Sequence, residues 1–257
     1  MSGGDGYFVG GAADAYDDIL VPAMFDPWAA RVAALLGEPG DAVLDIACGT
    51  GVLLPYLVDA GWTRVVGVDP SDSMLGRAGE RTPEAEFVQA GAEDLPFDDA
   101  EADAVASSFG LMFMDDPSAA LAEMARVTRP GGRMVVSTWG HVDDCPGFAG
   151  IVAAIESLKG GRATELLRTA FSMGDPDELA EIADDAGLDA VRVTSHTIDA
   201  EFDSLADIAQ AYCTSLAIGD PSEAGALEGE LARTMGPWMR GESVAFPVSG
   251  LILQARA

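Results

Sequence analysis

The chain has 257 residues, of which 49% are hydrophobic and 22% are charged, so it is long enough to bury one substantial core. Its 43 acidic and 14 basic residues leave a formal net charge of -29. A surface this negative repels the phosphates of nucleic acids and the headgroups of anionic lipids, so neither nucleic acid nor membrane is expected as a partner.

The beginning of the chain lacks the pattern of a signal peptide. Residues 1–7 contain no basic residue ahead of an apolar run, and no segment approaches the ~18 consecutive apolar residues of a membrane span. The three cysteines, Cys48, Cys145 and Cys213, lack metal-site spacing, so we predict reduced packing residues and no metal site. These features predict a cytoplasmic protein, and they leave its oligomeric state open.

The first predicted elements are two or three short helices in 12–36, where apolar residues at helical spacing are interrupted by Pro22 and Pro27. Behind Gly40, short apolar runs alternate with helical stretches. The predicted strands are 43–47, 65–68, 86–89, 104–107, 134–138, 190–197 and 244–253. The predicted helices are about 52–60, 73–81, 118–127, 147–167, 175–186, 205–218 and 223–239.

The early strands consist of Val, Ile and Ala without polar alternation, which is typical of parallel strands buried on both faces. The sequence therefore predicts a single doubly wound α/β domain over 1–257. We expect a helical lid in 1–38, a cofactor-binding core in 40–140, and substrate-side helices with the last strands in 141–257. The helical insertions should lie over the carboxyl edge of the sheet, where ligands bind in open α/β folds.

The segment Val43–Gly51 runs from a strand through a glycine turn into a helix. Glycines let a ligand approach the backbone, and the start of a helix offers free N–H groups. The NAD fingerprint requires a third glycine where Leu54 stands, and a P-loop requires a Gly-Lys-Ser/Thr that is absent. Both phosphate-binding alternatives therefore fail.

Two acidic residues, Asp45 and Asp69, stand in or at the end of the strands next to this turn. Asp45 stands four residues before the first glycine, inside an apolar strand where an unpaired acid is costly to bury, which suits a ligand that carries a cation. Asp69 ends the next strand and can accept hydrogen bonds from both hydroxyls of a ribose, although a simple turn role is equally open. A nucleoside with a cation and no phosphate describes S-adenosylmethionine.

The motifs resemble those of the class I S-adenosylmethionine-dependent methyltransferases. The resemblance covers about 40–140 and rests on Asp45–Gly51, Gly67–Ser71 with Met74-Leu75, Ala92–Phe97 and Arg129–Gly132. The chain looks most like the subgroup of quinone-pathway C-methyltransferases and small-molecule tailoring enzymes. This resemblance implies a mainly parallel, seven-stranded Rossmann-like sheet with helices on both faces. It also implies methyl transfer from S-adenosyl-L-methionine to O, N or C of a small molecule.

The resemblance further implies roles for single residues. Gly49 and Gly51 would lie under the methionine part of the cofactor, with Asp45 near its ammonium group, and Asp69 would hold the ribose. The remaining implied cofactor contacts are Ala47, Pro70, Met74, Ala92, Glu93, Ser108 and Phe109.

One position departs from the family pattern. Many relatives have Gly-Asp-Ala where this chain has Ala90-Gly91-Ala92, so the usual side-chain acceptor for the adenine amino group is missing. Either Glu93 or a water would have to replace it.

Methyl transfer from a sulfonium is an in-line displacement, so alignment alone can supply ~7 to 11 kcal/mol of the barrier. A base is required only for acceptors such as a phenol, an acidic carbon or an ammonium. His141, directly after the fifth strand, and Tyr16, in the N-terminal helices, are the candidate catalytic residues, although a lone histidine is more often structural.

The acceptor side should be lined by large apolar residues, which favours an aromatic or apolar small molecule. The candidates are Phe8, Met112, Trp139, Phe171, Met173 and Tyr212. Two alternatives stay open: a methyltransferase that acts on protein or RNA, and a non-catalytic protein that binds S-adenosylmethionine.

Overall fold

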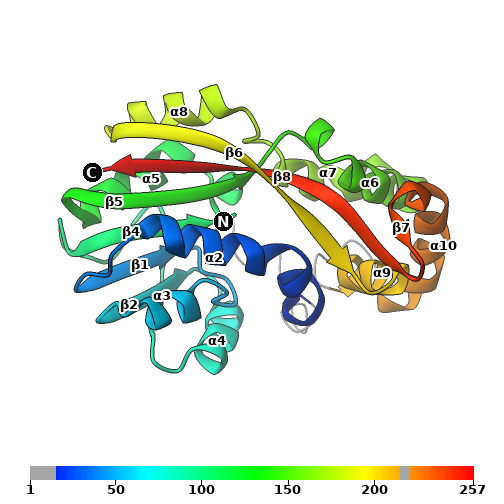
Figure 1. Ribbon diagram of the computed structural model, residues 1–257, viewed down its shortest axis with the longest axis horizontal. Helices are drawn as coiled ribbons and strands as arrows, with labels where there is room; N and C mark the ends of the chain where they lie inside the picture. Colours follow the sequence, from blue (N-terminus) through cyan, green and yellow to red (C-terminus); the bar gives the residue numbers. More distant parts are fainter. Residues whose placement is uncertain (1–15, 215–219) are drawn as a thin grey trace.

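The computed structural model describes residues 16–214 and 220–257 (Figure 1), so the predicted substrate contact Phe8 lies outside the described residues. The strands are β1 (Ala42–Ile46), β2 (Arg64–Asp69), β3 (Glu86–Gln89), β4 (Ala102–Ser108), β5 (Thr128–Trp139), β6 (Asp189–Phe202), β7 (Met239–Arg240) and β8 (Ser243–Arg256). The longer helices are η1 (Tyr16–Phe25), α2 (Asp26–Leu36), α3 (Leu54–Ala60), α4 (Asp72–Arg81), α5 (Pro117–Val127), α6 (Pro146–Lys159), α7 (Glu165–Ala170), α8 (Pro176–Asp185), α9 (Leu205–Thr214) and α10 (Ala224–Thr234). Single helical turns form η2 (Leu111–Phe113), η3 (Val142–Asp144), η4 (Gly161–Thr164), η5 (Pro221–Glu223) and η6 (Gly236–Trp238).

The strands form one mixed sheet in the order β3-β2-β1-β4-β5-β8-β6, and the short β7 pairs with β8. The five strands from β3 to β5 are parallel, whereas β8 runs antiparallel to both β5 and β6. The predicted doubly wound, mainly parallel sheet is confirmed, with one short strand more than expected. The chain order reverses between β1 and β4, which is the position where such sheets bind ligands.

Burial explains why the central strands were recognisable. All five residues of β1 and nearly all of β2 and β4 are buried, because helices cover both faces of the sheet. Helices α2 and α3 pack against each other and against the sheet, while α5 and α8 contact each other and cover β5, β6 and β8 (Figure 1).

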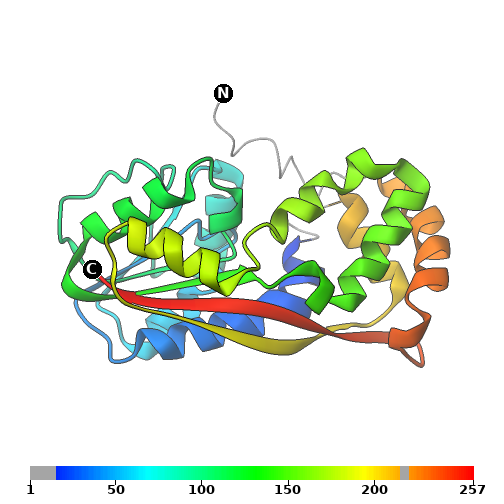
Figure 2. The same ribbon diagram turned by 90° about the horizontal axis from the view of Figure 1, so that it is seen from above.

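The last two long strands extend beyond the parallel part of the sheet. β6 and β8 stay paired from Asp189 opposite Arg256 to Phe202 opposite Val244. Their far ends carry the helical group formed by α6, α7, α9 and α10, which Figure 2 shows as a second lobe. The predicted strand 190–197 ends too early, because β6 continues to Phe202 with Ile198, Ala200 and Phe202 alternating with polar residues.

The N-terminal segment divides into two parts. Trp28, Val32 and Leu36 of α2 are fully buried in the main core, so α2 is a core helix, and η1 is the part that lies over the ligand edge. By length and composition the helical run Tyr16–Leu36 could cross a membrane, although no such segment was expected. Half of its most apolar stretch is buried inside the protein, as in the core helix of a globular domain.

Candidate functional site

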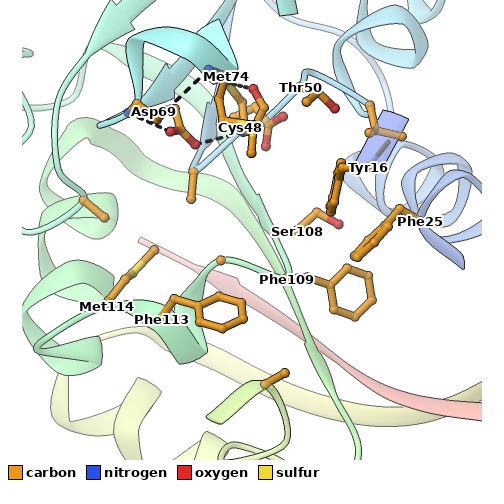
Figure 3. Close-up of a pocket in the computed structure, with 18 of the residues that line it drawn as sticks. Tyr16, Phe25, Cys48, Thr50, Asp69, Met74, Ser108, Phe109, Phe113 and Met114 are labelled. Carbon is orange, nitrogen blue, oxygen red and sulfur yellow. Dashed lines mark hydrogen bonds between the residues drawn. The ribbon is translucent and has the colours of Figure 1, made fainter. Parts of the chain in front are cut away.

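A cavity of about 430 Å³ lies at the carboxyl ends of the parallel strands (Figure 3). Residues at the carboxyl ends of β1, β2, β4 and β5 and in the segment after β3 form its sheet side, η1 covers it, and α6, α7 and α9 close its far end. The sequence-predicted residues that it brings together are Tyr16, Asp45, Ala47, Gly49, Asp69, Pro70, Met74, Ala92, Glu93, Ser108, Phe109, Trp139, Phe171 and Tyr212.

The glycine turn after β1 has the shape that a close ligand requires. Gly49 has a φ of +55°, and a Cβ added there would meet nothing within 4 Å, so its backbone is open to an incoming group. Gly51 has a φ of +76° and serves packing instead, because a Cβ there would lie 2.9 Å from Cβ of Ala78 in α4. Gly51 is not among the residues that line the cavity.

Two non-glycine residues adopt left-handed backbone conformations at this edge. Ala47 after β1 and Phe109 after β4 both have a φ of 58°. Such conformations are costly for residues with a Cβ and cluster at functional sites. They aim the two chain segments that flank the switch point of the sheet into the same cavity.

Asp69 links the end of β2 to the glycine turn. Its Oδ2 accepts a hydrogen bond from the backbone N–H of Gly49 at 2.9 Å, and its Oδ1 accepts one from Ser71 at 2.9 Å (Figure 3). Burial raises the pKa of this carboxyl, and the two N–H donors oppose that rise. Each carboxylate oxygen retains capacity to accept a second hydrogen bond from a ligand.

Asp45 is a buried acid that has an unsatisfied oxygen. The residue is 1% exposed, lines the cavity, and its Oδ1 has no hydrogen-bond partner. Burial, with a smaller contribution from the charge of Asp69, raises the pKa of Asp45 well above its ordinary value. An unpaired buried carboxyl group of this kind is costly and is best satisfied by a cationic ligand.

The segment after β3 contributes Ala92 to the wall of the cavity and Glu93 to a contact between two loops. Ala92 is buried and lines the cavity beside Glu93. Oε1 of Glu93 accepts a hydrogen bond from the backbone N–H of Asp115 at 3.0 Å, so this carboxylate holds the loop after β4 against the segment after β3.

The far end of the cavity is aromatic. The rings of Phe109 and Trp139 stack with their centroids 4.0 Å apart, and Phe25 meets both of them edge-on at 5.6 Å. Phe148 of α6 then joins Trp139 to Phe171. These five side chains, which we call the aromatic cluster, all line the cavity.

Several predicted residues lie elsewhere. Met112 and Met173 are buried, but they are not among the lining residues. The side chain of His141 is 58% exposed, and its Nδ1 accepts a hydrogen bond from the backbone N–H of Asp143 at the start of η3. The structure therefore does not place His141 among the residues that line the cavity.

Tyr16 does line the cavity, within a tilted ring contact of 5.0 Å to Phe25. Burial, and secondarily the charge of Asp17, raise the pKa of its hydroxyl above the ordinary value. The hydroxyl therefore stays protonated at neutral pH, so it can orient a ligand through hydrogen bonds but does not act as a ready base.

Sequence reasoning missed part of the lining. Phe113 and Asp115 stand in the loop after β4, and Phe148 stands on α6. Phe148 had no distinguishing signal, because only the folding of α6 back over the sheet edge brings it to the cavity. In the loop after β4 the sequence analysis chose Met112, whereas Phe113 and Asp115 of the same loop line the cavity.

Comparisons with known proteins match the part of the chain that contains the glycine turn and the residues after β2, β3 and β4. A family model described as "Methyltransferase domain" matches residues 44–136. The demethylmenaquinone methyltransferase of Renibacterium salmoninarum is 42% identical over 129 residues, which are 50% of this chain and 54% of that protein. The ubiquinone/menaquinone biosynthesis C-methyltransferase UbiE of Bdellovibrio bacteriovorus is 37% identical over 136 residues, 51% of this chain and 58% of that protein. The chain spans about half the length of these curated relatives.

Solved structures share the fold over a longer part of the chain. The YcgJ protein of Bacillus subtilis has a TM-score of 0.62 at 16% identity, covering 89% of this chain and 97% of that one. A phosphoethanolamine N-methyltransferase of Haemonchus contortus, solved with S-adenosylhomocysteine, has a TM-score of 0.62 at 16% identity, covering 95% and 56%. At these identities the likeness shows the fold alone.

Proposed function

We propose that the chain is a class I S-adenosylmethionine-dependent methyltransferase and that it transfers a methyl group from S-adenosyl-L-methionine to an apolar small-molecule acceptor. Residues 44–136 match a methyltransferase domain, which supports this proposal. The observation that carries this proposal is the buried, unsatisfied Oδ1 of Asp45, which lines the cavity at the glycine turn. This carboxyl group fits the ammonium group of the methyl donor, whereas a pyrophosphate ligand would meet a repulsive negative charge there.

The residues around the turn fit the rest of the donor. The open backbone of Gly49 accommodates its methionine part, and Asp69 has oxygen lone pairs left for the ribose hydroxyls. Pro70, Met74 and Ala92 would pack along the adenosine. When bound, the donor supplies an activated methyl group on a sulfonium, so the protein chiefly has to hold the acceptor in line with it.

The acceptor would occupy the end of the cavity formed by the aromatic cluster, which provides an apolar surface for an aromatic or lipid-like molecule. The names of the curated relatives specify quinone-pathway substrates, which agree with an apolar acceptor. The formal charge of -29 favours such a molecule over nucleic acid or an anionic membrane as partner, and we expect the reaction to take place in the cytoplasm.

In this proposal, most of the rate acceleration comes from aligning the acceptor with the methyl group of the donor. The acceptor and the methyl group would meet against a wall formed by Ser108, Phe109 and Trp139. Oγ of Ser108 lies 3.1 Å from Oγ of Ser137, and the rings of Phe109 and Trp139 stack on each other. His141 is outside this wall and Tyr16 is protonated, so general-base help would be a minor contribution.

The test is a donor-consumption assay over a library of apolar small molecules, run beside calorimetry with the donor alone. Turnover with small molecules supports the proposal. Donor binding without turnover on any class of acceptor would identify a non-catalytic binding protein. Turnover only on protein or RNA would contradict the small-molecule assignment.

A further inference from the structure

The acceptor end of the cavity is built by parts of the chain outside the family match. The match ends at residue 136, whereas Trp139, Phe148 and Phe171 come from the end of β5, from α6 and from the residue after α7. The acceptor can therefore differ from those of the curated relatives, and its chemistry has to be read from these residues.

The charges around the cavity all have one sign. Asp45, Asp69, Glu93 and Asp115 line it, and among the described lining residues there is no Lys, Arg or His. The described cation on α7, Arg168, is not among the lining residues and pairs with Glu156 at 3.4 Å. An acceptor with a carboxylate or phosphate would meet repulsion without a counter-ion, whereas a cation would be attracted.

Aromatic rings add to the preference for positive charge. The electron-rich faces of Trp and Phe attract ammonium groups, and boxes of such rings recognise quaternary ammonium ligands. The aromatic cluster gathers five rings at the acceptor end, within one cavity that also holds the four carboxylates.

The described lining residues offer the acceptor no histidine or lysine as a base, and Asp45, whose pKa is raised by burial, is assigned to the ammonium group of the donor. A phenol or an acidic carbon must give up a proton before it can attack, and carboxylates are much weaker bases than phenolates. The hydroxyls of Tyr16 and Tyr212 are held protonated, because burial raises the pKa of each. The cavity therefore gives little help to acceptors that must lose a proton before they attack the methyl group.

We propose that the acceptor is a weakly basic amine on an apolar body, which is uncharged at neutral pH and is methylated at nitrogen to a cationic product, an inference that rests on the proposed methyl transfer. The nitrogen lone pair forms the new N–C bond while the bond between the methyl carbon and the sulfonium sulfur breaks, and that electron pair stays on sulfur. Positive charge thus passes from sulfur to nitrogen. No proton has to leave during the step, and an N–H proton of the product passes to water afterwards.

The experiment uses the full chain saturated with S-adenosylhomocysteine and measures the binding of three shape-matched probes by calorimetry. The probes are benzyltrimethylammonium, its neutral isostere with carbon in place of nitrogen, and the anion 3-phenylpropionate. We expect the cation to bind about tenfold more tightly than the neutral isostere, and the anion not to bind. Equal binding of cation and isostere, binding of the anion, or failure of the cation to bind would overturn the inference.

Two variants test whether the preference for the cationic probe comes from the aromatic cluster. Phe171→Leu removes a ring of the aromatic cluster and should remove most of the preference for the cation. Phe202→Leu changes a buried phenylalanine of β6 that is not a lining residue, and it should keep the preference. Equal loss in both variants would overturn the assignment.

A methyl-transfer assay with amines and phenols of the same shape distinguishes this inference from the proposed function. Methyl transfer to apolar amines but not to phenols of the same shape supports both. Transfer to phenols but not amines refutes the amine and leaves the methyltransferase proposal intact. Failure of S-adenosylhomocysteine itself to bind would instead refute the proposed function.

Discussion

Asp45 makes the stability of the cofactor-free protein depend on pH. Its pKa is raised by burial, so at intermediate pH the folded chain holds a proton that the unfolded chain has lost. The free energy of unfolding that this group contributes therefore falls as pH rises above about 4, the ordinary pKa of Asp, and is lowest above the raised pKa.

We predict that Asp45→Asn raises the melting temperature of the cofactor-free protein at neutral pH and weakens its binding of S-adenosylmethionine. The amide removes the cost of a buried charge together with the partner for the ammonium group. Scanning calorimetry and titration calorimetry measure the two effects, with the exposed Asp59→Asn of α3 as the charge control. A lower melting temperature with unchanged affinity would contradict this account of Asp45.

His141 should be dispensable for the reaction. Its exposed ring begins η3 and is not a lining residue, so we expect His141→Asn to keep the rate within about twofold and the pH profile unchanged. A general base would contribute about 100-fold or more. A loss of that size, together with loss of a rise in rate near neutral pH, would show that the histidine reaches the acceptor after all.

At the residue scale, the sequence predicts the donor end of the site better than the acceptor end. Asp45, Gly49 and Asp69 are recognisable because a buried acid, an open glycine and a strand-end acid occur at fixed local spacing, and all three line the cavity. Phe148 is not predictable from the sequence, because its position depends on how α6 folds against β8. The exposed position of His141 is likewise set by the local turn into η3.

The helical segment η1 is held over the cavity by ion pairs with α4. Asp17 contacts Nη2 of Arg81 at 2.6 Å and Nε of Arg77 at 3.7 Å. Nε of Arg81 also donates a hydrogen bond to the carbonyl of Thr50 in the glycine turn, so one guanidinium joins the lid segment to the donor end of the cavity.

We predict that Asp17→Asn weakens donor binding about 3- to 10-fold and leaves the fold intact, because partly exposed ion pairs contribute roughly 1 kcal/mol or less each. The matched control is Asp18→Asn, since Asp18 is the exposed neighbour. Titration calorimetry measures the affinities, and circular dichroism checks the fold. Equal effects of the two substitutions would mean that η1 is not positioned by these pairs.

At the element scale, strands were predictable where both faces are buried. Apart from Asp45 in β1 and a few polar residues in β4, these two strands are built from apolar residues that pack against the helices on both faces of the sheet. The end of β6 was not predicted, because its pairing with β8 depends on a distant part of the chain, although Ile198, Ala200 and Phe202 alternate with exposed polar residues as a strand requires. The sequence predicts α2 as part of a lid, whereas the structure buries it in the core, because the apolar face of a helix does not reveal which surface it covers.

The charge of the whole molecule predicts a salt effect. With 43 acidic and 14 basic residues the folded chain repels itself, and salt screens that repulsion over a Debye length of about 10 Å at 0.1 M. We expect the melting temperature to rise by several degrees between about 0.05 and 1 M NaCl. A melting temperature that falls over this range would show that the ion pairs, such as Arg64 with Glu86 and Glu101, outweigh the repulsion.

The most direct test of the whole account is a calorimetric titration of S-adenosylmethionine into the wild-type protein and into Asp69→Ala. Asp69 lines the cavity and holds the glycine turn through Gly49, so its loss should weaken binding by about 2 to 3 kcal/mol, the range for a buried charged hydrogen-bonding group. NAD should not bind either protein. Tight binding of NAD to the wild type, or unchanged affinity for S-adenosylmethionine in a folded Asp69→Ala variant, would contradict the assignment of this cavity.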